Sequence, residues 1–183
     1  FFRNPQNIRP FFRTRRPSVA QVVVLMGSAS DEDRVSPCVD VLKSLGVSCA
    51  ITVSSAHRTP ERTEELVRTH EAQGARVFIC AAGMAAHLAG AVAARTTLPV
   101  IGIPVSGTAL GGMDALLSTV QMPPGFPVAT VALDTAGARN AAWLAAQILA
   151  LSDPELGRKI AAARAAMRAD VEKTGEALTR KYA

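Results

Sequence analysis

Short apolar runs alternate with longer segments of mixed polarity along the chain from residue 21 onward. An apolar run that is too short for a helix and has no alternating polar face is typical of a strand buried on both sides in a parallel sheet. This pattern predicts strands over residues 22–26, 47–53, 76–82, 99–105 and 128–133. The segments between them are long enough to hold the helices that connect parallel strands.

Start and stop signals for helices fall in these connecting segments. Ser30 is expected to cap a helix that carries acidic residues in its first turn and ends near Gly46. Thr59 and Pro60 are expected to begin a second helix, which ends at Gly74, because proline is favoured at the first helical position. Two further helices are predicted, an alanine-rich one over residues 136–151 and a long C-terminal one that begins at residues 152–155.

This alternation predicts an α/β fold, a doubly wound parallel sheet with right-handed crossovers. The 183 residues suit one domain, which we assign to residues 21–183. Ligands of such sheets bind outside the carboxyl ends of the strands. The glycine- and serine-rich turns that follow the predicted strands are therefore expected to form one candidate site.

The net positive charge of the chain is confined to its N-terminal segment. The formal net charge is +5, and Arg3, Arg9, Arg13, Arg15 and Arg16 stand in a segment without a single acid. In residues 21–183 the remaining 15 Lys and Arg are balanced by 15 Asp and Glu, so a basic surface for nucleic acid is not expected on the domain. Residues 1–20 are interpreted as a basic Phe/Arg/Pro tail outside the core, and the composition of this tail leaves organellar targeting open.

Residue usage argues against several other classes. No apolar run reaches the ~18–20 residues that span a bilayer, so no membrane partner is expected. Cys38, Cys49 and Cys80 have no CxxC spacing, and their odd number argues against a complete disulfide framework. Cys49 and Cys80 are predicted to be buried, which fits a reducing, cytoplasmic setting. The three histidines lack paired acids, so no metal site is expected.

Polar side chains follow the first predicted strand, at residues 27–31. Backbone N–H groups and the hydroxyls of Ser28 and Ser30 at a helix N-terminus suit a phosphate. The segment matches neither the GxGxxG motif nor a P-loop. Asp31 could instead bind ribose hydroxyls, and an ordinary capping turn explains the segment equally well.

The turns after the next two strands carry the other candidates. Arg58 can hold a phosphate or a carboxylate with two hydrogen bonds, and His57 can move protons near neutral pH. Ser55 adds a hydroxyl to the same turn. His87 either caps its helix or touches the ligand, and the residues alone favour the structural role. The absence of GxSxG argues against a Ser-His-Asp hydrolase.

Seven segments, in order between residues 22 and 151, together resemble the PurE family of purine biosynthesis. They are MGSASD at 26–31, VSSAHRTP at 53–60, AAHL at 85–88, LPVIGIPV at 98–105, LSTVQMP at 117–123, PVATVA at 127–132 and AGARNAA at 136–142. Each is weak evidence alone, and their shared order makes the resemblance specific. Met84 and Ala89 depart from it, since many mutases of the family have Gly and Pro there.

The resemblance implies a three-layer flavodoxin-like fold, a homo-octamer and a reaction without metal or cofactor. It implies the isomerisation of N5-carboxyaminoimidazole ribonucleotide to 4-carboxyaminoimidazole ribonucleotide, with His57 as the acid and base. It also implies a functional link to the synthetase that makes this substrate. By position, the ribose phosphate would be bound by Ser28, Asp31, Ser55 and Arg58. The base and carboxylate pocket would be lined by Ala82, Gly83, His87 and Leu88, with Ser30 and Ala56 as further neighbours.

Three alternatives remain beside the mutase. The direct carboxylases of the same family use CO2 and tend to have Lys where this chain has Arg58, so Arg58 resembles the mutase branch. A relative that acts on a pyridine nucleotide carboxylate is a second alternative. A non-catalytic nucleotide-binding module is the third, although binding alone would not need His57.

Overall fold

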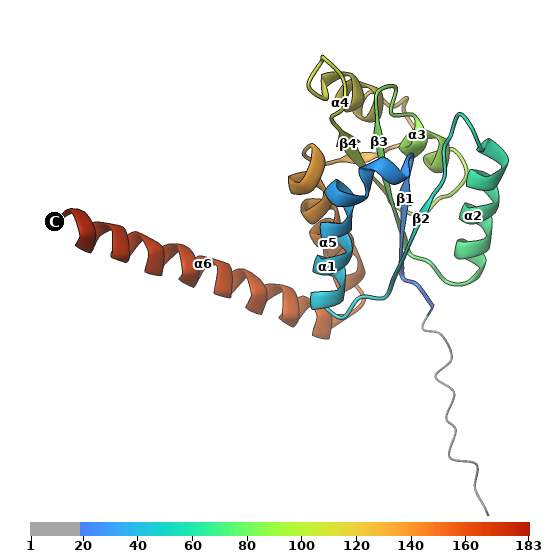
Figure 1. The fold of residues 1–183 in the computed structure, drawn as a ribbon. Coiled ribbons are helices and arrows are strands. Elements are labelled where there is room, and N and C mark those ends of the chain that lie inside the picture. The colour runs from blue at the N-terminus through green and yellow to red at the C-terminus, as the bar shows by residue number, and fades with distance from the viewer. Residues whose placement is uncertain (1–18) are drawn as a thin grey trace, which may run out of the picture.

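Five parallel strands form the sheet in residues 19–183, the part of the chain that the computed structural model describes (Figure 1). They are β1 Val22–Met26, β2 Cys49–Val53, β3 Val77–Gly83, β4 Val100–Val105 and β5 Ala129–Thr130. Their order, β2-β1-β3-β4-β5, is the flavodoxin-like order, which confirms the predicted fold class. The predicted tail falls outside the described range, apart from its last two residues.

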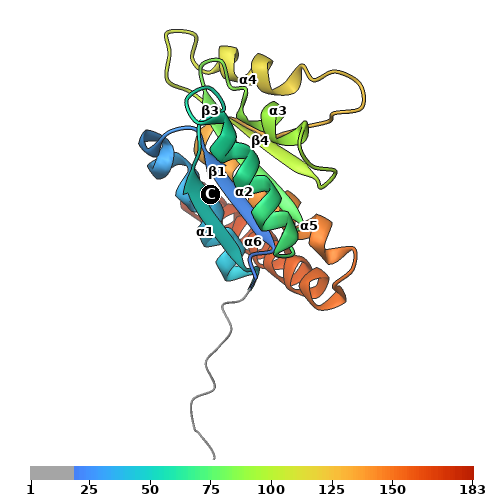
Figure 2. The ribbon, with the colours of Figure 1, turned by 90° about the vertical axis from the view of Figure 1, so that its right-hand side faces the viewer.

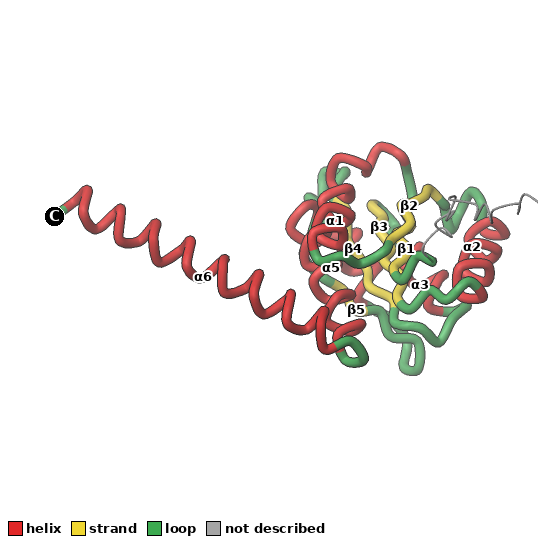
Figure 3. Tube along the Cα trace, turned by 90° about the horizontal axis from the view of Figure 1, so that it is seen from below, coloured by secondary structure: helices red, strands yellow, loops and turns green. Residues whose placement is uncertain are grey.

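Helices cover both faces of the sheet, which gives three layers (Figures 2 and 3). One face is covered by α1 (Glu32–Ser44) and α5 (Asp134–Ala150), and the other by α2 (Pro60–Ala72) and α3 (Leu88–Ala93). The helix α4 (Met113–Val120) packs against β4 and β5. The last helix, α6 (Pro154–Tyr182), leaves the body of the domain.

The central strand β1 explains why a continuous apolar run forms a strand here. Val22, Val24 and Met26 belong to the core cluster under α1 and α5, whereas Val23 and Leu25 belong to the cluster under α2 and α3. Successive side chains point to opposite faces of the sheet, and both faces are covered, so every position of the strand must be apolar. All five residues of β1 are buried.

The long C-terminal helix is present as predicted, and most of it lies away from the body (Figure 3). The Asp153 carboxylate accepts hydrogen bonds from the backbone N–H groups of Glu155 and Leu156 and so caps the helix. Leu156 and Ile160 are buried in the core cluster beside α5, but the residues that follow are almost all exposed. No helix of the described part of the chain is long and apolar enough to cross a membrane.

Several local predictions were wrong. Ser28, not Ser30, is the capping residue: its Oγ accepts from the backbone N–H of Ser30 and caps a single 3₁₀ turn, η1 (Ala29–Asp31), from which α1 continues. Thr59 occupies the N-cap position of α2 and Pro60 begins the helix as predicted, but the Thr59 hydroxyl is bonded to the backbone of Ser55 and makes no capping hydrogen bond. Cys49 is only half-buried, because it lies on the edge strand β2.

Two short helices were missed, and one strand is shorter than predicted. α3 and α4 have six and eight residues, too few to display a helical period in the sequence. The predicted strand at 128–133 shrinks to Ala129–Thr130, since only the first part of this segment runs beside β4. The predicted helix at 136–151 begins earlier, at Asp134.

Candidate active site

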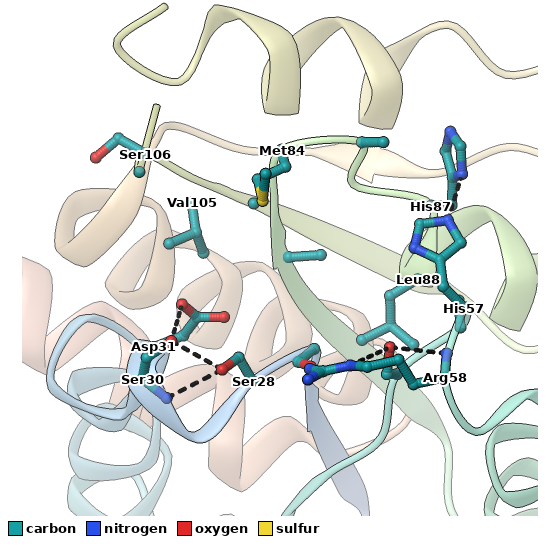
Figure 4. A pocket seen from close by; sticks show the side chains of 17 residues that line it. Ser28, Ser30, Asp31, His57, Arg58, Met84, His87, Leu88, Val105 and Ser106 are labelled. Atoms are coloured by element: carbon teal, nitrogen blue, oxygen red, sulfur yellow. Dashed lines mark hydrogen bonds between the residues drawn. The ribbon is translucent and has the colours of Figure 1, made fainter. Parts of the chain in front are cut away.

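A pocket of about 580 Å³ lies where the strand order reverses, between β1 and β3 (Figure 4). This is the position at which open parallel sheets bind ligands, because the connections from neighbouring strands leave in opposite directions there. The eleven residues predicted from the sequence all line it: Ser28, Ser30, Asp31, Ser55, Ala56, His57, Arg58, Ala82, Gly83, His87 and Leu88. The structure therefore brings the candidates together, and their chemical roles stay predictions.

The turn after β1 forms one side of the pocket. The Gly27 N–H donates to the Ala81 carbonyl, which ties the start of this turn to β3. The hydroxyls of Ser28 and Ser30 lie 2.8 Å apart, and the Ser30 hydroxyl also donates to Asp31 Oδ1. This turn thus presents two hydroxyls and the Asp31 carboxylate at η1.

The Asp31 carboxyl is in an environment that disfavours its charge. Partial burial raises the pKa of Asp31 above its ordinary value, and the Asp134 carboxylate adds to this effect. The hydrogen bond from Ser30 and the Arg34 guanidinium act in the opposite direction. Carboxyl groups with competing influences of this kind are common at functional sites.

The turn after β2 supplies the cationic group. Arg58 Nη2 donates to the Gly27 carbonyl at 3.1 Å, and Arg58 Nε contacts Ser55 Oγ at 3.4 Å. The guanidinium therefore bridges the exits of β1 and β2, while the Ser55 hydroxyl also accepts from the Arg58 backbone N–H. Below it, the buried hydroxyls of Ser54 and Thr63 are bonded to each other at 2.8 Å and fix the turn to α2.

Two imidazoles form the opposite wall. His57 follows β2 and His87 precedes α3, and His57 Nε2 lies 2.8 Å from His87 Nδ1. His87 occupies the N-cap position of α3, but its side chain makes no capping hydrogen bond. The structural capping role that the residues alone favoured is therefore wrong, and the ring is bonded to His57 instead.

The exit of β3 forms the floor of the pocket and has little room to vary. A Cβ atom added to Gly83 would lie 2.9 Å from the Val105 carbonyl oxygen, so a side chain there would push the ends of β3 and β4 apart. The next residue, Met84, has a left-handed backbone (φ 57°), which residues with a Cβ rarely adopt. Its side chain lines the pocket and is 65% exposed.

Six lining residues were not among the predicted site residues: Gly27, Met84, Ala85, Val105, Ser106 and Gly107. Gly27, Met84 and Ala85 neighbour predicted positions. Val105–Gly107 is the exit of β4, and the rule that ligands bind at carboxyl ends of strands would have found it. Ser106 is held by Arg34 and Asp134, to which no signal in the sequence points.

No cysteine thiol contributes to this pocket. Cys38, Cys49 and Cys80 all lie elsewhere. Burial raises the pKa of Cys38 to about 12, and burial also raises the pKa of Cys80 above its ordinary value. Within residues 19–183, no three His, Cys, Asp or Glu side chains are grouped so that they could hold a metal ion. The polar groups that face a ligand are hydroxyls, one carboxylate, one guanidinium and two imidazoles.

These features define a flavodoxin-like α/β protein with a site for a small polar ligand at the switch point of its sheet. A family model described as AIR carboxylase matches residues 21–170. The chain belongs to the AIR carboxylase family.

Known proteins of this family are similar over most of the chain. The N5-carboxyaminoimidazole ribonucleotide mutase of Bacillus subtilis is 52% identical over 139 residues, which cover 76% of this chain and 86% of the relative. The protein of the same name from Escherichia coli is 46% identical over 145 residues, with coverages of 79% and 86%. The crystal structure of Treponema denticola PurE matches with a TM-score of 0.73 at 31% identity, covering 85% of this chain and 94% of that one.

Proposed function

We propose that the protein converts N5-carboxyaminoimidazole ribonucleotide to 4-carboxyaminoimidazole ribonucleotide, a step of purine biosynthesis. The observation that carries this proposal is the gathering of His57, Arg58 and Asp31 around one pocket in a chain about 50% identical to mutases of that name. The substrate is a small ribonucleotide, and the pocket of about 580 Å³ is of the size that such ligands need.

Each charged group of the pocket would bind a different part of the ligand. The Arg58 guanidinium would hold the phosphate, helped by the hydroxyls of Ser28 and Ser55, since a guanidinium forms strong paired hydrogen bonds to phosphate oxygens. The Asp31 carboxylate accepts hydrogen bonds, so it suits the ribose hydroxyls. The imidazole ring of the substrate would then lie toward Ala82, Gly83 and Leu88, near the two histidines.

The chemistry requires that a carboxyl group moves without being lost. The N–CO2 bond of the substrate breaks, giving CO2 and the ring amine, and the neighbouring ring carbon then attacks the CO2. Holding both fragments in one pocket replaces a high concentration of CO2, because a bound reactant has a large effective molarity. Exclusion of water from the pocket also protects the fragments.

His57 would carry the protons in this sequence. It hydrogen-bonds or protonates the departing nitrogen as the first bond breaks. After recapture, the ring carbon bears both a hydrogen and the new carboxylate, and His57 removes that proton and restores aromaticity. The ring of His87, in contact with His57, orients the base and gives the proton a second position.

An absorbance assay tests this proposal. Purified protein and the N5-carboxy substrate should give 4-carboxyaminoimidazole ribonucleotide at a rate proportional to enzyme, without added bicarbonate. The direct carboxylase, which the description of the family model keeps as the second candidate, would instead need aminoimidazole ribonucleotide and CO2. Turnover only under the second set of conditions would overturn the mutase, and turnover under neither would overturn both.

We further propose that the protein works as a homo-octamer in which α6 packs on another copy. Beyond Ile160 this helix exposes Met167, Val171, Leu178 and Tyr182 at helical spacing, an apolar stripe that nothing within residues 19–183 covers. Light scattering should give eight chains for the wild type and a smaller particle for Met167→Glu/Val171→Glu, whereas an unchanged mass would exclude this docking.

The synthetase of the labile N-carboxy substrate is proposed as the functional partner.

A further inference from the structure

The first residue after β4, Ser106, has all of its polar groups engaged by two residues that are distant in sequence. Its backbone N–H donates to Asp134 Oδ1 at 2.9 Å, and its hydroxyl donates to Asp134 Oδ2 at 2.7 Å. Its carbonyl accepts a hydrogen bond from Arg34 Nη1. Ser106 lines the pocket, whereas Asp134 and Arg34 lie behind it and do not. We name these three residues the Ser106 clamp.

The backbone at Asp134 indicates that the clamp is held at some cost. Asp134 is the first residue of α5 and has φ 53°, in the left-handed region that residues with a Cβ seldom adopt. Such conformations persist where the surrounding structure over-determines them, and they cluster at functional sites. Here both carboxylate oxygens are bonded to one residue of the pocket wall.

Arg34 completes the clamp and balances its charge. Arg34 Nη1 lies 3.6 Å from Asp134 Oδ1, so the guanidinium neutralises a carboxylate that would otherwise stand close to an anionic ligand. The positive charge of Arg34 also lowers the pKa of Asp31, which lines the same side of the pocket. The clamp therefore joins α1, the exit of β4 and the start of α5 directly beside Asp31.

The hydrogen-bonding state of Ser106 decides what it offers to a ligand. Because its one hydroxyl hydrogen is directed to Asp134, the lone pairs of Oγ remain, and it can only accept from a ligand. Asp31 is an acceptor as well when ionised. Figure 4 shows Ser106 and Asp31 on one side of the pocket, with His57 and His87 on the other. Ser106 and ionised Asp31 therefore both offer acceptors to a ligand, so this pair of residues suits ligand O–H groups.

We propose that the Ser106 clamp makes this wall a specificity determinant for ribose, reading a sugar hydroxyl together with Asp31 and rejecting deoxyribose. The proposal rests on the function proposed above, and it names Arg34 and Asp134 as positioning residues that act through Ser106. When the sugar lacks this hydroxyl, the hydrogen bond to Ser106 and Asp31 is lost, and the half-buried acceptors are left without that partner.

Calorimetric titration with aminoimidazole ribonucleotide and its 2′-deoxy and 3′-deoxy analogues tests the proposal. In the wild type, at least one deoxy analogue should bind about 10-fold more weakly or worse. Ser106→Ala should bring the analogue to within about 3-fold of the ribonucleotide, because the acceptor is gone. Equal affinity of the wild type for all three ligands would overturn the proposal even if the enzyme turns over its substrate.

The variant Asp134→Asn separates the clamp from simple packing. Asparagine tolerates the left-handed backbone, but its amide group donates to Ser106 Oγ and turns the hydroxyl hydrogen toward the ligand. Ribonucleotide affinity should fall about 10-fold while the unfolding midpoint changes little.

Amide hydrogen exchange at Ser106 and Gly107, which needs no activity, should become faster in Asp134→Gly, and unchanged exchange there would also overturn the clamp.

Glu64→Gln provides the matched control. It weakens the Glu64–Arg95 ion pair, whose N–O distance is 3.3 Å and whose residues do not line this pocket. Its ligand affinities and its exchange at Ser106 should equal those of the wild type. If Glu64→Gln reproduced the loss of ribose selectivity, the effect would be global and the assignment to the clamp would be wrong. A wild type that fails to turn over the N5-carboxy substrate would instead count against the proposed function.

Discussion

His57 Nε2 lies 2.8 Å from His87 Nδ1, and the two rings meet nearly edge to face at 77°. One nitrogen of this contact must donate and the other must accept, because two N–H groups cannot be bonded to each other. The contact therefore fixes which tautomers the two rings can adopt together. It leaves His57 Nδ1 and His87 Nε2 as the ring nitrogens that the contact does not use.

Replacement of His57 should mainly affect the chemical step. His57→Asn is expected to lower kcat by about 100-fold to 10,000-fold, the usual contribution of a general acid or base. The KM for the N5-carboxy substrate should change little, since His57 moves a proton and Arg58 holds the charge. His70→Asn, in α2 and outside the pocket, is the control and should keep kcat within about twofold. A near-normal kcat for His57→Asn would remove His57 from the mechanism.

Replacement of Arg58 should mainly affect binding. Charge-assisted hydrogen bonds contribute about 1.5–3 kcal/mol, so Arg58→Ala should raise KM about 10-fold to 100-fold, with a much smaller change in kcat. The matched variant is Arg62→Ala, whose guanidinium contacts the Val53 carbonyl and the Thr52 hydroxyl rather than the pocket. Steady-state kinetics of both variants measures this difference. A KM for Arg58→Ala equal to that of Arg62→Ala would show that Arg58 does not hold the phosphate.

The left-handed backbone of Met84 gives a prediction on stability. Glycine adopts φ 57° without steric cost, and the Met84 side chain buries little, so Met84→Gly should raise the free energy of unfolding by about 1 kcal/mol. Ala85→Gly is the control: Ala85 has no positive φ, and its replacement should lower stability by about 0.4–1 kcal/mol. Denaturant unfolding at one fixed protein concentration measures both. A Met84→Gly variant as unstable as Ala85→Gly would mean that the Met84 side chain contributes contacts that outweigh the strain.

The raised pKa of Asp31 implies that its charge destabilises the folded protein. The folded state binds the Asp31 proton at a higher pH than the unfolded chain does, so this group makes stability fall as the pH rises through that window. Asp31→Asn should therefore melt at a higher temperature than the wild type near pH 7. The difference should shrink toward zero as the pH approaches the ordinary Asp value of about 3.9. Thermal unfolding across this range measures it, and a variant that melts lower than the wild type near pH 7 would contradict the sign.

The pattern of apolar residues predicted all five strands, although β5 is shorter than predicted. The run at Val22–Met26 became β1 without a change of bounds, because a strand covered on both faces has no polar position to blur its limits. Short elements were harder. α3 and α4 have too few residues for a helical period, and the start of α1 shifted because Ser28 formed a 3₁₀ turn before the helix.

The candidate site was predictable where function follows from local motifs. Ser28, Asp31, His57 and Arg58 follow strands directly, so the position of strand ends in a parallel sheet brings them together. The Ser106 clamp was not predictable, since Arg34 and Asp134 lie 72 and 28 positions from Ser106 along the chain. Their meeting depends on how α1 and α5 pack side by side, which no single segment encodes.

The complete burial of β1 has a consequence for how the protein opens. Backbone amides exchange with solvent only when local structure unfolds, and strands at the centre of a core open last. The turns that carry Ser28 and Met84 are extensions of β1 and β3, which lie side by side at this centre. The exposed length of α6 can therefore fray repeatedly while the floor of the pocket keeps its shape. Motion at the C-terminus and order at the site are thus energetically separate in the single chain.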